Sequence, residues 1–123
     1  MEFSGWVSGA SLIAMGVLAL VVPARIPRVF GGAAETPAAR NEIRAVYGGF
    51  GLALGTLVVW SLSQGHLGEG VRLAAAVSVA GMAAGRVVSL AADRATGGMW
   101  PWVFFAIEVG MAALLLAGNA RQY

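Results

Sequence analysis

Two ionisable residues, Arg86 and Glu108, lie within stretches of the sequence that are otherwise apolar and uncharged. A charged side chain at the centre of a membrane helix costs about 2.5–3.5 kcal/mol on insertion scales, so each residue needs a polar partner. Three arrangements meet this need. The two residues form an ion pair that joins their helices; or Arg86 extends to the lipid headgroups while Glu108 is protonated or faces a partner subunit; or both belong to a functional site for proton coupling or an anionic headgroup.

The spacing of the two residues places them at one depth. Arg86 lies seven residues before Asp93, and Glu108 lies seven residues after Pro101. Both are also equally distant along the chain from Gly97. In an antiparallel helical hairpin with its turn at Gly97, the two side chains share one level, about 10 Å inside the helix ends at 1.5 Å per residue.

A second polar group, Arg40, Arg44 and Tyr47, lies around the start of the second apolar stretch. Guanidinium groups bind phosphate through two parallel hydrogen bonds, and a helix N-terminus favours anions. These three residues are therefore candidates for contact with an anionic lipid headgroup or a partner protein. The alternative is that the arginines anchor the helix at the membrane surface and pair with Asp93 or Glu42.

Several kinds of chemistry are excluded or not expected. The sequence has no cysteine and one histidine, His66, which excludes disulfides, thiolate metal sites and a haem held by two histidines of one chain. We expect His66 to be a solvated turn residue. There is no phosphate-binding glycine loop, nucleophile elbow or pair of acids, and no basic run with interleaved aromatic residues. We therefore expect no catalytic residue, no metal, no cofactor and no nucleic-acid partner, and a protein that is not an enzyme.

Four long apolar stretches must position these residues. They cover residues 3–24, 45–67, 73–92 and 95–120. Each is long enough to cross a membrane, because a spanning helix needs about 20 apolar residues. Charged residues make up 11% of the chain, against about 25% in soluble domains. The sequence predicts an all-α integral membrane four-helix bundle, made of two transmembrane hairpins in a single domain over residues 1–123.

Local signals give approximate helix bounds of 3–22, 37–63, 71–93 and 101–118. Pro23 ends the first helix, and Thr36 with Pro37 is typical of an N-cap followed by proline at the first helical position. The glycine-rich segment 64–70 predicts a turn. The first helix lacks the basic start of a signal peptide, so we expect a retained span.

Small residues lie at helical spacing on all four helices, where they favour close packing of helices in lipid. The positions expected to pack helices are Gly48, Gly51 and Gly55 in the second helix, Gly81 and Gly85 in the third, and Gly110 in the fourth. The alternative is that one such face docks another protein. In the fourth helix Glu108 lies opposite the small residues, so this helix is either central in the bundle or turns Glu108 toward a neighbouring chain.

The arginines are distributed unequally between the two sides. The first and third connections with their helix ends hold Arg25, Arg28, Arg40, Arg44 and Arg94, and the opposite side holds Arg72 and Arg121. Basic residues favour the cytoplasmic side. We therefore expect a bacterial plasma (inner) membrane protein with its first and third connections in the cytoplasm and both termini outside.

The segment Arg44-Ala45-Val46-Tyr47-Gly48-Gly49, preceded by residues 39–43 and followed by 52–55, resembles an uncharacterised family. Its members are small bacterial four-span membrane proteins with a domain of unknown function, distantly similar to DoxX-like proteins. The resemblance implies the fold and the membrane location. It brings no activity, and Phe50-Gly51 stands where members of that group carry an acidic residue.

Two functions fit these features. The first is a non-catalytic accessory subunit of a larger plasma-membrane complex, such as a transporter or a respiratory or envelope-building assembly. The alternative is a small homo-oligomeric transporter or lipid-binding protein that uses Arg86 and Glu108. The lipid bilayer, other membrane subunits and anionic lipid are the expected partners.

Overall fold

Most of the residues that the structure describes are helical, and none of them forms a strand. A computed structural model describes residues 2–29, 32–93 and 99–120. The elements are α1 (Glu2–Val21), α2 (Arg25–Arg28), α3 (Pro37–Ile43), the π-helix η1 (Arg44–Gly49), α4 (Phe50–Ser61), α5 (Gly65–Asp93) and α6 (Trp100–Ala120). Four spans, α1, the continuous α3–η1–α4, α5 and α6, are long and apolar enough to cross a membrane. The chain is thus a multi-pass membrane protein, and the predicted all-α fold is confirmed.

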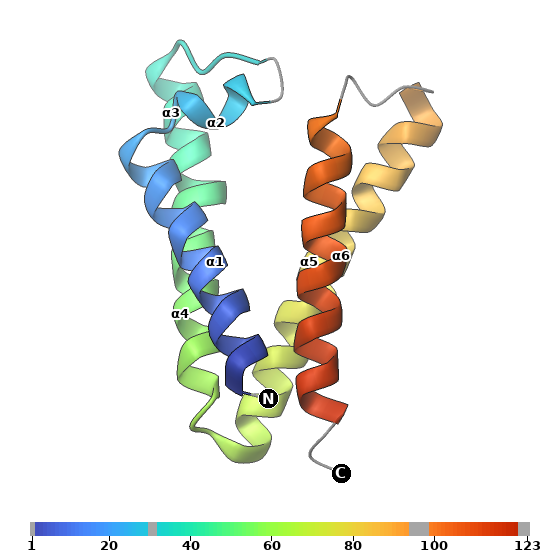
Figure 1. Ribbon diagram of the computed structural model, residues 1–123. Coiled ribbons are helices and arrows are strands. Elements are labelled where there is room, and N and C mark those ends of the chain that lie inside the picture. Colours follow the sequence, from blue (N-terminus) through green and yellow to red (C-terminus); the bar gives the residue numbers. More distant parts are fainter. Residues whose placement is uncertain (1, 30–31, 94–98, 121–123) are drawn as a thin grey trace.

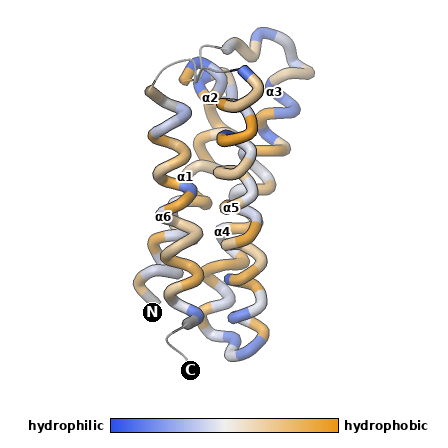
Figure 2. The backbone as a smooth tube through the Cα atoms, turned by 90° about the vertical axis from the view of Figure 1, so that its right-hand side faces the viewer, coloured by the Kyte–Doolittle hydropathy of each residue, from blue (hydrophilic) through white to orange (hydrophobic). Residues whose placement is uncertain are grey.

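The four spans pair as two antiparallel hairpins (Figure 1). One hairpin consists of α1 and α4 and the other of α5 and α6, and these two pairs make the most extensive contacts. The hairpins approach each other where α4 turns into α5 and diverge toward the end that carries α2 and α3 (Figure 1). Hydrophilic residues gather at both ends and apolar residues between them (Figure 2), as a membrane environment requires.

The core lies where the two hairpins meet. Its buried members are Leu12, Val58, Ala75, Ala76 and Leu115, so each of the four spans contributes at least one residue. The other large apolar side chains mostly face outward, which suits a surface covered by lipid. Exposed tryptophans lie near the helix ends at Trp6, Trp60 and Trp102, where aromatic rings favour the membrane interface.

Glycines hold the first hairpin together. A Cβ atom placed on Gly16 would lie 2.5 Å from the backbone nitrogen of Leu52 and 2.8 Å from the carbonyl oxygen of Gly48. A Cβ on Gly55 would lie 2.7 Å from the carbonyl oxygen of Gly9. Gly51 similarly faces the α1 backbone. A Cβ on Gly48 would lie 2.9 Å from the side chain of Leu20. The predicted packing role of Gly48, Gly51 and Gly55 therefore agrees with the structure, because all three face α1 with no room for a side chain.

The small residues of the second hairpin do not pack as predicted. Among residues 2–29, 32–93 and 99–120, nothing outside the surrounding helix lies within 4 Å of a Cβ built on Gly81, Gly85 or Gly110. These positions are exposed, although α5 and α6 are in extensive contact. The prediction that these three glycines pack helices of this chain is wrong, because a small-residue pattern shows that close packing is possible without showing which surfaces meet.

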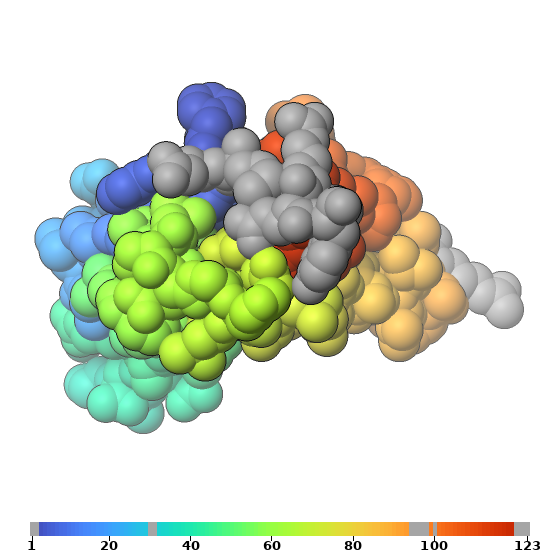
Figure 3. Space-filling view, turned by 90° about the horizontal axis from the view of Figure 1, so that it is seen from below, coloured from blue at the N-terminus to red at the C-terminus, as the bar shows by residue number. Residues whose placement is uncertain are grey.

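The turn between the hairpins is shorter than predicted. Helix α5 begins at Gly65, six residues before the predicted start at 71. Gly65 has φ +37°, a left-handed conformation that glycine adopts without strain. Gly68, which the sequence placed in a turn, lies in the helix, where a Cβ would collide with the carbonyl oxygen of Ser61. Its lack of a side chain lets the end of α4 touch α5, as the view from below illustrates (Figure 3).

The N-terminus of α3 follows its sequence signal. The Thr36 hydroxyl accepts a hydrogen bond of 3.1 Å from the backbone N–H of Ala39, and Pro37 occupies the first helical position. The predicted N-cap is confirmed.

The predictions for the third connection cannot be compared in this way, because Arg94, Thr96 and Gly97 lie outside the described residues, as does Arg121.

Replacing Gly16 with alanine should destabilise the protein, whereas Gly81→Ala should not. The new methyl group at residue 16 has no room between α1 and α4, and overpacking typically costs about 1–3 kcal/mol. At residue 81 the methyl meets nothing, and alanine favours the helix by up to about 1 kcal/mol. Unfolding of both variants by denaturing detergent in mixed micelles measures the difference. Equal stability of the two variants would contradict the described packing.

Candidate functional site

Arg86 and Glu108 are in direct contact. The Nε of Arg86 donates to Oε2 of Glu108 at 2.7 Å, and Nη2 donates to Oε1 at 2.6 Å. The Glu108 side chain is 8% exposed and that of Arg86 25%. The guanidinium carbon also lies 5.4 Å from the centre of the Phe104 ring, within the range of a cation–π interaction. The structure thus has the bidentate pair that the hairpin register predicts, with Glu108 turned toward α5.

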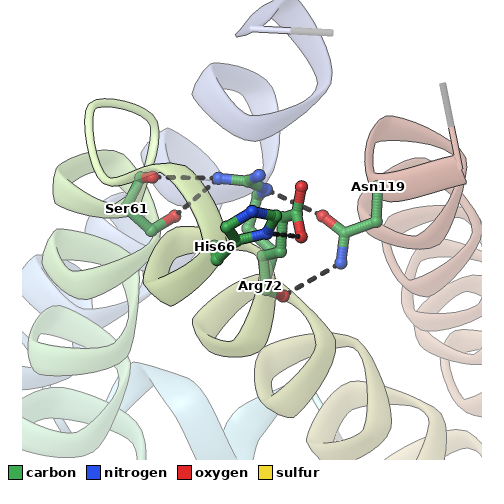
Figure 4. Close-up of polar contacts among 5 residues, drawn as sticks. Ser61, His66, Arg72 and Asn119 are labelled. Carbon is green, nitrogen blue, oxygen red and sulfur yellow. Dashed lines mark hydrogen bonds and ion pairs between the residues drawn. The ribbon is translucent and has the colours of Figure 1, made fainter. Parts of the chain in front are cut away.

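A second arginine of α5 forms a contact that the sequence analysis missed. Arg72 is buried, although it was counted only as a basic residue at the membrane surface. Its Nε donates to Oδ1 of Asn119 at 2.9 Å, and its Nη1 donates to the carbonyl oxygen of Ser61 at 2.9 Å. Asn119 in turn donates to the carbonyl oxygen of Glu69 at 3.0 Å. Figure 4 shows Arg72 between Ser61 of α4 and Asn119 of α6, so one side chain joins three spans.

The hairpin register contains a signal for this contact. Reflection about Gly97 carries residue 72 to residue 122, three residues beyond Asn119, which is less than one helical turn. A search for polar residues near that position would have found Asn119.

His66, predicted to be a solvated turn residue, is solvated but helical. It lies in the first turn of α5, 94% exposed, with its Nδ1 3.2 Å from Oε2 of Glu69.

Arg40 and Arg44 hydrogen-bond to backbone carbonyls. Nη1 of Arg40 donates to the carbonyl oxygens of Ala34 and Glu35, at 3.2 and 3.0 Å. Nε of Arg44 donates at 3.1 Å to the carbonyl oxygen of Leu20, one of the unpaired carbonyls in the last turn of α1. Within residues 2–29, 32–93 and 99–120 neither arginine pairs with Glu42 or Asp93, so the predicted ion pairs are wrong. Arg44 joins η1 to the end of α1, whereas Arg40 holds the segment that precedes α3.

Tyr47 lies in the π-helix η1 and faces a different direction from Arg44. The six residues of η1 (Arg44–Gly49) are those of the Arg-x-x-Tyr-Gly-Gly segment. Arg44 and Gly48 contact Leu20 of α1, whereas Tyr47 lines a cleft on the side of α5. π-Helical turns are rare and are frequent at functional sites.

An apolar cleft opens where the hairpins diverge. Its volume is ≈ 390 Å³, within the range of about 300–1,000 Å³ that is typical of small-molecule sites. Its walls come from α1, from η1 with α4, and from α5. The lining residues are Leu12, Met15, Val46, Tyr47, Phe50, Leu54, Ser78, Val79 and Met82. Among the described residues no group of three or more His, Cys, Asp or Glu side chains is placed to hold a metal ion.

The chain matches a known protein family over most of its length. Residues 1–118 match the family described as Domain of unknown function (DUF4345). The chain belongs to the DUF4345 family. No curated protein and no solved structure matches it. The matched part of this DUF4345 protein contains the Arg86–Glu108 pair, Arg72 and the cleft, whereas Asn119 lies one residue beyond it.

Removing one member of the ion pair should be more harmful than removing both. Glu108→Ala leaves the partly buried guanidinium of Arg86 without its carboxylate, which should cost about 3–5 kcal/mol. The double variant Arg86→Leu/Glu108→Leu should recover most of this loss, because no unpaired charge remains in the membrane. Detergent-induced unfolding measures both free energies. The exposed Glu42→Ala serves as the control, and a double variant no more stable than Glu108→Ala would refute the coupling.

Proposed function

We propose that this DUF4345 protein is a non-catalytic accessory subunit of a larger membrane complex, and that the outer face of α6 packs against a transmembrane helix of another subunit. The observation that carries the proposal is the exposure of an unbroken small-residue face in the middle of a membrane span. That face consists of Ala106, Gly110, Ala113 and Ala117, all exposed.

Comparison with the first hairpin supports this use of the face. Gly9 and Gly16 of α1 lie against the α4 backbone, and Gly55 of α4 lies against α1. The chain therefore uses small residues for close helix contact where both partners are its own. In α6 an equivalent face meets nothing within the described residues at Gly110. Because lipid supplies no hydrophobic drive between helices, a close-packing face has its main use against another helix.

The two faces of α6 have different partners. Glu108, Ala112 and Leu115 are buried on the inward side, and Glu108 is held there by Arg86. The small face lies on the opposite side of the helix, since residues 106, 110, 113 and 117 are about half a turn from 108, 112 and 115. A partner helix on α6 would therefore leave the ion pair in place. This arrangement suits a subunit that folds first and then assembles.

The proposal extends to location and ancestry. We place the protein in the bacterial plasma membrane as part of a transporter or of a respiratory or envelope-building complex. Arg25, Arg28, Arg40 and Arg44 favour a cytoplasmic position for the end that carries α2 and α3. The Arg-x-x-Tyr-Gly-Gly segment, which forms η1, supports a distant relationship to DoxX-like proteins.

Enlarging the α6 face should abolish assembly without unfolding the chain. Gly110→Leu places a large side chain where nothing lies within 4 Å, so stability should change little. The matched control is Val109→Leu, at a position that is 45% exposed on the same helix but outside the small face. Mild-detergent purification at native expression level, followed by mass spectrometry, should recover a partner membrane protein with the wild type and Val109→Leu only. A protein that runs alone at monomer mass, or only as copies of itself, would refute the accessory role.

The orientation has its own test, because the sequence contains no cysteine. Glu35→Cys and Ser63→Cys place single thiols at exposed positions in the first and second connections. In right-side-out spheroplasts a membrane-impermeant maleimide should label residue 63 directly and residue 35 only after permeabilisation. The reverse pattern would show that the termini face the cytoplasm.

A further inference from the structure

We propose that the cleft between the hairpins binds a single-chain lipid whose small head is uncharged and carries a hydroxyl or carbonyl oxygen. This inference does not depend on the α6 face, which lies elsewhere on the molecule. It is argued from the walls of the cleft, from the hydroxyl of Tyr47 and from the position of charged residues relative to the cleft.

The walls select a slender apolar chain. Seven of the nine lining residues are apolar, and Tyr47 and Ser78 are the two exceptions. The Ser78 hydroxyl already donates to the carbonyl oxygen of Ala74 at 2.8 Å. Val46, Phe50 and Met82 are 50%, 55% and 41% exposed, so the cleft is open toward the surrounding lipid and a chain can enter sideways from the bilayer. A volume of ≈ 390 Å³ suits one such chain.

Tyr47 supplies a hydrogen-bond donor inside this apolar space. Its side chain is partly buried, and in the described part of the chain its hydroxyl has no hydrogen-bond partner among the contacts of at most 3.5 Å. This hydroxyl is therefore available to donate to a ligand, and tyrosine hydroxyls in largely apolar surroundings usually find a partner. A ligand oxygen at this position would satisfy the hydroxyl.

The charges near Tyr47 favour an uncharged head. None of the nine residues that line the cleft is charged, and Arg86 lies one helical turn after Met82 on α5. Its charge is compensated by Glu108 at 2.6 Å. An ionised head would find no counter-ion among the lining residues, and an unpaired charge in an apolar space is costly. A neutral hydroxyl or carbonyl group avoids this cost.

The π-helix explains why the donor faces the cleft. Residues 44–49 have the wider π-helical turn, while Arg44 and Gly48 remain on the α1 side. Tyr47 and Val46 are thereby presented to the space between the hairpins, where they line the cleft with Ser78 and Met82 of α5. Val46 and Tyr47 thus belong to the π-helix and also line the cleft.

Photolabelling in lipid nanodiscs tests the site. The probe is hexadecan-1-ol with a diazirine in its chain, compared with hexadecane and hexadecanoate that carry the same group. We expect the alcohol to label cleft residues such as Val46 and Met82 several-fold more than either analogue does. Tyr47→Phe should reduce labelling by the alcohol about five- to tenfold, the value of one hydrogen bond, to the level of the alkane.

Two further variants separate the cleft from the general lipid surface. Val46→Trp should block labelling by filling the opening, whereas Leu57→Trp, at a similarly exposed position on α4 outside the cleft, should not. Thermal unfolding verifies that each variant is folded. Uniform labelling of the lipid-facing surface, an unchanged result with Tyr47→Phe, stronger labelling by hexadecanoate, or cross-linking of a partner protein into the cleft would each overturn the proposal. Gly110→Leu should leave the labelling intact, so loss of partner binding and loss of the lipid site are distinguishable.

Discussion

Every guanidinium within a membrane span must find polar partners, and the arrangement of the second hairpin depends on how α5 meets this need. Arg72 and Arg86 are 14 residues apart on α5, about 21 Å along the helix axis. Each reaches a polar side chain of α6, Asn119 in one case and Glu108 in the other. Two contacts at different depths fix both the register and the rotation of α6. They also determine which face of α6 is left for the surroundings.

The two hairpins are therefore held by different interactions. In the first hairpin glycines bring the backbones of α1 and α4 into contact, and dispersion forces act over a long, close interface. In the second hairpin the polar contacts of α5 set the arrangement, and Cβ atoms built on Gly81, Gly85 and Gly110 meet nothing within 4 Å among the described residues. Arg72 also binds the carbonyl oxygen of Ser61, so a polar contact reaches the first hairpin at the end where α4 turns into α5. This is the end at which the hairpins meet (Figure 1).

The sequence predicts those features that depend on local chemistry or on symmetry about a turn. The four spans follow from length and hydropathy, the start of α3 from Thr36 and Pro37, and the contact of Arg86 with Glu108 from their equal distance to Gly97. Features that depend on which surfaces meet are not predictable in this way. Gly68 has the residue type of a turn and is helical because the end of α4 needs its space. Gly55 and Gly110 have the same pattern around them, yet only Gly55 has a partner helix. No simple pattern of residue types predicts the π-helix. The separation of Tyr47 from Arg44 follows from the π-helix and was therefore not predicted either.

The cleft is a consequence of the same distribution of contacts. The hairpins are joined at one end by Arg72 and by the core around Val58 and Leu115. At the level of Arg86, the carboxylate partner Glu108 lies on the same hairpin as the arginine. If the partner of Arg86 were on α4, the ion pair would draw the hairpins together and Tyr47 would be enclosed between them. With Glu108 on α6, the charge is neutralised within the second hairpin, and the space beside Tyr47 stays apolar and open to lipid. The position of a single carboxylate thus decides whether this end of the bundle is a closed core or a binding site.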